Sequence, residues 1–87
     1  MDSTLTHTRN PLTGWDISAL TKTGKGETIA AAKISVNGFP EYDETFEQPL
    51  NQWQHQLTQK GTYPGDNKVL LEITDGNGQV IRAQDSW

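Results

Sequence analysis

The stretch from Gly61 to Val80 constrains the fold more than any other part of this sequence. It contains one strand-like run, Lys68 to Thr74, between two clusters of turn residues, Tyr63-Pro64-Gly65-Asp66 and Asp75-Gly76-Asn77-Gly78. A second β-type run, Gln79 to Ala83, follows the second cluster directly. Turn residues that separate two runs of β-forming residues are typical of a β-hairpin, so we predict one here.

The first strand of this hairpin should lie inside a sheet. Val69, Leu71 and Ile73 alternate with polar neighbours, as expected for a strand with one apolar face. Leu70 interrupts the polar face, which indicates a strand buried on much of both sides. We therefore expect the run to be central.

Alternation of apolar and polar residues also marks the remaining strands. It predicts a short strand over Trp15 to Ala19, and further strands over Thr28 to Val36, Phe39 to Phe46 and Gln52 to Leu57. In the second of these, the even positions should face inward. In the last, Trp53 is the expected core residue. Between the strands Thr28 to Val36 and Phe39 to Phe46, Asn37-Gly38 suits a type I′ turn. Pro40 marks the second of these strands as an edge, or its beginning as irregular.

Six to seven strands without a helical segment predict an all-β fold, a small antiparallel β-sandwich or barrel. The 87 residues should form a single domain, 1–87. Residues Met1 to Asn10 are polar and rich in threonine, so they are expected to be a flexible tail or a thin edge strand, and the tail is favoured.

The charge of the chain argues against two classes of partner. Seven basic and eleven acidic residues give a net charge of −4, and the basic residues are scattered. Nucleic-acid binding needs clustered Lys and Arg, and anionic membranes need a basic surface, so neither partner is expected. There is no cysteine to form a disulfide or a thiolate metal site.

The sequence also limits the expected location. The N-terminal residues do not read as a signal peptide, and no apolar run approaches the ~20 residues that span a bilayer. The chain is expected to be cytoplasmic, or extracellular or on the cell surface if it is a segment of a larger exported protein.

Residues 28–83 resemble bacterial immunoglobulin-like modules of surface, adhesive and enzyme-appended proteins. The resemblance rests on Ile34-Ser35-Val36-Asn37-Gly38, on Trp53, on Gly61-Thr62-Tyr63-Pro64-Gly65 and on the strand Asn67 to Asp75 with its closing turn. It implies an immunoglobulin-like β-sandwich in which Tyr63 is a corner tyrosine bonded to the backbone. The alternative is a small SH3- or Sm-like barrel, acting inside the cell as an oligomer or nucleic-acid module.

A second, shorter resemblance concerns Asn10-Pro11-Leu12-Thr13-Gly14-Trp15. It is similar to one loop of chagasin-like cysteine-protease inhibitors. The glycine-rich second loop and the Arg-Pro-aromatic third loop of that family have no counterpart here. Protease inhibition is therefore kept as a lesser alternative.

The residue types leave little room for catalysis or metal binding. The only histidines are His7 and His55, and no Gly-x-Ser-x-Gly elbow or cysteine accompanies them. The carboxylates between Glu41 and Glu47 suit a solvated edge strand. Asp75-x-Asn77 lacks the remaining ligands of a calcium loop. We expect no catalytic residues, no metal and no cofactor.

Aromatic residues are the remaining candidates for function. Trp15, Phe39 and Tyr42 lie near predicted turns, where exposed rings could stack on a sugar or anchor a protein partner. The competing interpretation is that the aromatic residues cap the open ends of the sandwich. The sequence thus favours a non-enzymatic binding or spacer module of a surface, phage or enzyme-appended protein, with protein or carbohydrate contacts. It does not define the oligomeric state.

Overall fold

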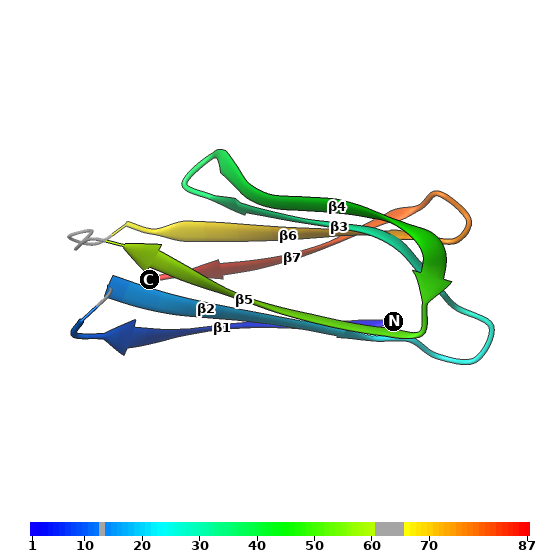
Figure 1. Ribbon diagram of the computed structural model, residues 1–87, viewed down its shortest axis with the longest axis horizontal. Helices are drawn as coiled ribbons and strands as arrows, with labels where there is room; N and C mark the ends of the chain where they lie inside the picture. Colours follow the sequence, from blue (N-terminus) through cyan, green and yellow to red (C-terminus); the bar gives the residue numbers. More distant parts are fainter. Residues whose placement is uncertain (13, 61–65) are drawn as a thin grey trace.

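The computed structural model describes residues 1–12, 14–60 and 66–87 and contains seven β-strands (Figure 1). The strands are β1 (Asp2–Asn10), β2 (Gly14–Lys22), β3 (Ile29–Val36), β4 (Phe39–Leu50), β5 (Gln52–Lys60), β6 (Lys68–Asp75) and β7 (Val80–Ser86). Within these ranges the chain has no helix, and hence none that could cross a membrane.

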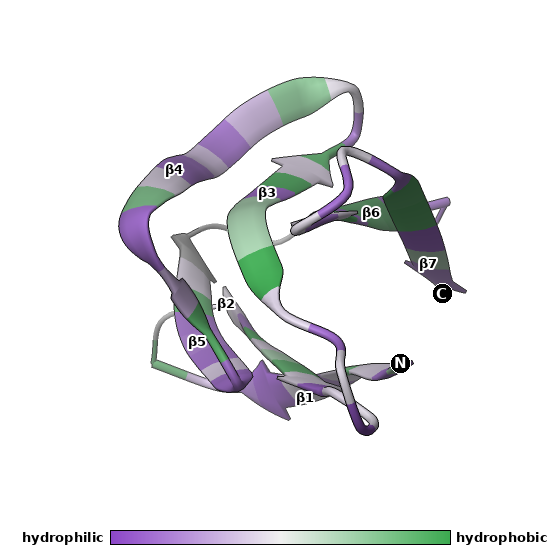
Figure 2. Cartoon of the chain, turned by 90° about the vertical axis from the view of Figure 1, so that its right-hand side faces the viewer, coloured by the Kyte–Doolittle hydropathy of each residue, from purple (hydrophilic) through white to green (hydrophobic). Residues whose placement is uncertain are grey.

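The strands form two antiparallel sheets. One has three strands in the order β1-β2-β5, and the other has four in the order β4-β3-β6-β7. The sheets face each other without closing into a barrel, so the predicted β-sandwich is confirmed and the barrel alternative is wrong. On one side of the sandwich β4 continues into β5, and on the other side β1 lies beside β7 (Figure 2).

The core is made by the inward-facing residues of both sheets. Its buried apolar members are Ile17, Ala19, Ile29, Ala32, Ile34, Val36, Trp53, Val69, Leu71 and Ile73. Successive side chains of a strand point to opposite faces, so residues two apart share the core face. The predicted inward positions are therefore confirmed for β6, for Trp53 and, in β3, for Ala32, Ile34 and Val36. The predicted central strand, β6, lies between β3 and β7.

Ile29 departs from the predicted alternation of β3. It is fully buried although it occupies an odd position, where the sequence pattern placed the outer face. Against β6, the register of β3 shifts by one residue between Ile29 and Ala31, because Ile29 lies opposite Asp75 and Ala31 opposite Thr74. Such a β-bulge adds one residue to a strand, and a one-residue shift moves the side chains before it to the other face.

Residues 2–10 form an edge strand, not the flexible tail that was favoured. β1 pairs with β2 along its whole length, from Asp2 opposite Lys22 to Asn10 opposite Gly14. Ser3, Leu5 and His7 face inward, while the alternating threonines face solvent. Pairing with β2, rather than the apolar content of β1 itself, holds this strand in place. Threonine suits it because β-branched residues are favourable in strands.

β4 is longer than predicted and keeps both of its prolines. The predicted strand ends at Phe46, whereas β4 continues through Pro49 to Leu50. It is an edge strand, as Pro40 indicated, and an edge tolerates a residue that cannot donate to the ladder. Only Asn51 separates it from β5, so the chain passes from one sheet to the other almost without a loop.

The two predicted turns, which lie at opposite ends of the four-stranded sheet, are present. Asn37 and Gly38 have φ values of 50° and 86°, the positive values that a type I′ turn requires. The predicted hairpin is formed by β6 and β7, which pair from Lys68 opposite Ser86 to Thr74 opposite Val80. Tyr63, the proposed corner tyrosine, lies outside the described residues.

Candidate functional site

The structure distributes the three predicted binding residues over three different surroundings. Trp15 lies in β2 and contacts His7 and Trp87. Tyr42 lies in β4 and contacts Trp53 and His55. Phe39 is not part of either cluster. Among the described residues, no ring contact joins any two of the three candidates.

The Trp15 cluster closes the side of the sandwich where β1 meets β7. The imidazole of His7 stacks on Trp87, with ring centroids 4.1 Å apart, and its Nδ1 lies 2.6 Å from Oδ2 of Asp85. Trp15 packs against both rings, at 5.6 Å from His7 and 5.2 Å from Trp87. Because His7 and Asp85 come from strands of different sheets, their contact ties the two sheets together.

The Tyr42 cluster closes the opposite side, where β4 meets β5. The rings of Tyr42 and His55 stack at 3.9 Å. The indole N–H of Trp53 donates to the Tyr42 hydroxyl at 3.4 Å, and that hydroxyl donates to the carboxylate of Glu44. Burial is the main cause that raises the pKa of Tyr42, and the hydrogen bond to Glu44 adds to it. Tyr42 is therefore a structural residue of this side rather than a free ring.

Phe39 is the one candidate that faces solvent, with 70% of its surface exposed. It follows the Asn37-Gly38 turn, and Asn37 fixes that turn to the start of β6. The backbone N–H of Asn37 donates to the carbonyl of Lys68 at 2.8 Å, and the N–H of Lys68 donates to Oδ1 of Asn37 at 2.9 Å. The amide of Asn37 also donates to Oδ1 of the buried Asn67 at 3.2 Å. A rigid turn thus presents an exposed ring.

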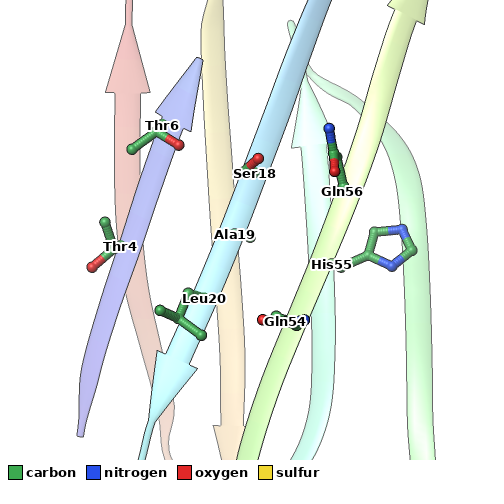
Figure 3. A pocket seen from close by; sticks show the side chains of 8 residues that line it. All are labelled: Thr4, Thr6, Ser18, Ala19, Leu20, Gln54, His55 and Gln56. Carbon is green, nitrogen blue, oxygen red and sulfur yellow. The ribbon is translucent and has the colours of Figure 1, made fainter. Parts of the chain in front are cut away.

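A further candidate, missed by the sequence analysis, is a hollow of about 550 Å³ on the outer face of the three-stranded sheet (Figure 3). Its walls come from all three strands. The residues that line it are Thr4, Thr6, Ser18, Ala19, Leu20, Gln54, His55 and Gln56. The alternation of exposed threonines in β1 and exposed glutamines in β5 was visible in the sequence, but only the strand order shows that they meet across β2.

The two histidines are the side chains whose surroundings bear on catalysis or metal binding. In the part of the chain that the structure describes, His7 has Asp85 as its one side-chain hydrogen-bond partner, and no hydroxyl joins the pair as a nucleophile would. Within the same residues, no group of three metal-ligating side chains comes together. His55 is half-buried on its strand.

Comparison with known proteins adds no family assignment. Neither a protein-family profile nor a curated protein matches the sequence.

Proposed function

We propose that the protein is a non-enzymatic, immunoglobulin-like module that binds a partner protein through the Phe39 turn. The strand order supports the immunoglobulin-like part of the proposal. In that fold the A, B and E strands share one sheet, and the C, F and G strands share the other, which gains a C′ strand beside C in variable-type domains. The orders β1-β2-β5 and β4-β3-β6-β7 correspond to that arrangement.

The observation that carries the binding part is the exposure of Phe39 on a fixed turn. Aromatic residues are enriched at the centres of protein interfaces, where they fill apolar pockets of the partner. A ring held on a rigid turn loses less conformational freedom on binding than one on a mobile loop, so more of its contact energy appears as affinity. Phe39 combines both properties, because the bonds of Asn37 to Lys68 and Asn67 immobilise the turn before it.

A second exposed apolar residue lies at the same end of the molecule as Phe39, which supports a binding role for that end. Leu12 is 93% exposed in the turn between β1 and β2, and that turn lies at the same end of the long axis as the turn between β3 and β4 (Figure 1). The molecule measures 41 Å along this axis and about half that across it. β1 begins toward the other end, whereas β7 finishes toward this one, an arrangement that also suits a spacer between neighbouring modules.

Site-specific photocrosslinking tests this proposal. Phe39 is replaced by p-benzoylphenylalanine in the full-length protein, in cells that express it, and the matched control carries the same residue at Val80. Val80 is also an exposed apolar residue, 42% exposed, but it starts β7 at the opposite end of the sandwich (Figure 1). We expect irradiation to give a defined covalent adduct with another protein from position 39 and none from position 80.

Two results would contradict the proposal. One is the absence of an adduct at position 39 under conditions in which the same probe crosslinks to an added control protein such as albumin. The other is the same adduct from both positions, because it would show contact that does not depend on the Phe39 end.

A further inference from the structure

The hollow on the three-stranded sheet has a shape that follows from the lengths of its side chains. Figure 3 shows Ser18 and Leu20 of β2 between the threonines of β1 and the glutamines of β5. Thr6, Ser18 and Gln56 form one row across the sheet, and Thr4, Leu20 and Gln54 form the next. The short Ser18 leaves a depression in the middle, and the longer Gln54 and Gln56 raise one wall.

The chemistry of the hollow is neutral and offers both donors and acceptors. Five of the six side chains in these two rows are hydroxyls or amides, each able to donate and accept hydrogen bonds, and the sixth is Leu20. The flanking charges are already engaged or lie beyond the rows. Asp16 accepts from Asn10 and Thr58 at 3.2 Å each, and Lys22 lies opposite Asp2.

The outer face of the other sheet shows that this neutrality is not a general property of the surface. There the register aligns Asp43, Lys33, Glu72 and Arg82 in one row across four strands. The charges alternate along the row, and Arg82 lies 3.2 Å from Glu72. Opposite charges on neighbouring strands stabilise a sheet. On the outer face of the three-stranded sheet, the two rows that line the hollow contain no charged side chain.

We propose that the hollow binds a neutral, polyhydroxylated ligand, namely a short oligosaccharide without carboxylate or sulfate groups. A ligand that both donates and accepts matches the hydroxyl and amide groups, and an uncharged ligand leaves no unpaired charge on the surface. Leu20 supplies a small apolar contact for the C–H face of a sugar ring. The walls on β1 and β5 stand about 10 Å apart, two strand spacings, which admits one ring between them.

The same composition argues against a protein as the occupant. Protein interfaces concentrate aromatic residues at their centres, and the hollow offers Leu20 as its single large apolar side chain among the outward-facing residues. Its volume of about 550 Å³ falls within the range of about 300–1,000 Å³ seen for small-molecule sites. The sugar site is separate from the Phe39 turn, so it does not depend on the function proposed above.

NMR titration of the ¹⁵N-labelled full chain tests the site. The probes are maltotriose, cellotriose and triacetylchitotriose, added to about 10 mM, because exposed hydrogen bonds alone should give a dissociation constant on the order of 1 mM. We expect at least one of them to shift the backbone amides of residues 4–6, 18–20 and 54–56 in a saturable way. The absence of a response to all three sugars would overturn the proposal.

Matched variants locate the binding. The double substitution Gln54→Ala and Gln56→Ala should weaken the responding sugar by about tenfold or more, since it removes one wall. Gln84→Ala removes an exposed glutamine of β7 on the outer face of the other sheet and should change nothing. Equal loss in both variants, shifts confined to the Phe39 turn, or equally tight binding of trigalacturonic acid would each contradict a neutral site in the hollow.

Discussion

Leu71→Ala is expected to lower the free energy of unfolding by about 2–4 kcal/mol. Leu71 is fully buried in the central strand β6, opposite Ile34 of β3 and Ala83 of β7. Its truncation removes the buried methyl groups and leaves a cavity between two sheets that cannot close fully. A domain of 87 residues has a total stability of roughly 4–13 kcal/mol, at about 0.05–0.15 kcal/mol per residue, so the loss is a large fraction.

The neighbouring Leu70 provides the matched control for this prediction. It is half-buried on the outer face of the same strand, between Ser35 and Gln84. We expect Leu70→Ala to cost about 1 kcal/mol or less, because its side chain already contacts water. Urea denaturation of both variants measures the difference. Equal losses would contradict the register of β6, since a shift by one residue exchanges the two faces.

Trp53→Ala is expected to be more severe, with a loss of about 3–5 kcal/mol. Trp53 is 5% exposed and is the largest side chain of the core. It also supports the side of the sandwich where β4 meets β5, because its indole packs against Tyr42 at 5.9 Å and donates to its hydroxyl. Removal of this side chain should therefore open the core and release Tyr42 together.

Trp53→Phe separates these two contributions and remains measurable if Trp53→Ala does not fold. It keeps an aromatic ring in the core but loses part of the volume and the hydrogen bond to Tyr42, so we expect a loss of about 1–2 kcal/mol. The readout is again the free energy of unfolding in urea. A Trp53→Ala variant as stable as the parent would show that the inward face of β5 has been assigned incorrectly.

The parts of the fold that could be predicted from sequence are those set by neighbouring residues. Alternation along β3 and β6 identified their inward residues, and Asn37-Gly38 identified its turn because both positions need positive φ. β1 could not be predicted in the same way. Its residues carry little apolar signal, and the strand forms because β2 pairs with it along its whole length.

The candidate sites depended more strongly on contacts between distant parts of the chain. The sequence identified Trp15 as a candidate, but in the structure Trp87 partly covers it. That contact exists because β7, which precedes Trp87, lies beside β1. Likewise, Tyr42 is withdrawn from solvent by His55 of the next strand. The neutral hollow arises from three strands and needs their register. Local patterns identify strands and faces, whereas a site requires the strand order.

We propose that the aromatic residues have two different roles. Tyr42 holds two sheets together, whereas Phe39 contacts little of its own protein and is available to a partner. The free energies of unfolding of Phe39→Ala and Tyr42→Ala, measured side by side in urea, test the claim directly. We predict a change within about 0.5 kcal/mol for Phe39→Ala, as for ordinary surface positions, and a loss above about 1.5 kcal/mol for Tyr42→Ala. A loss at Phe39 equal to or larger than that at Tyr42 would contradict it.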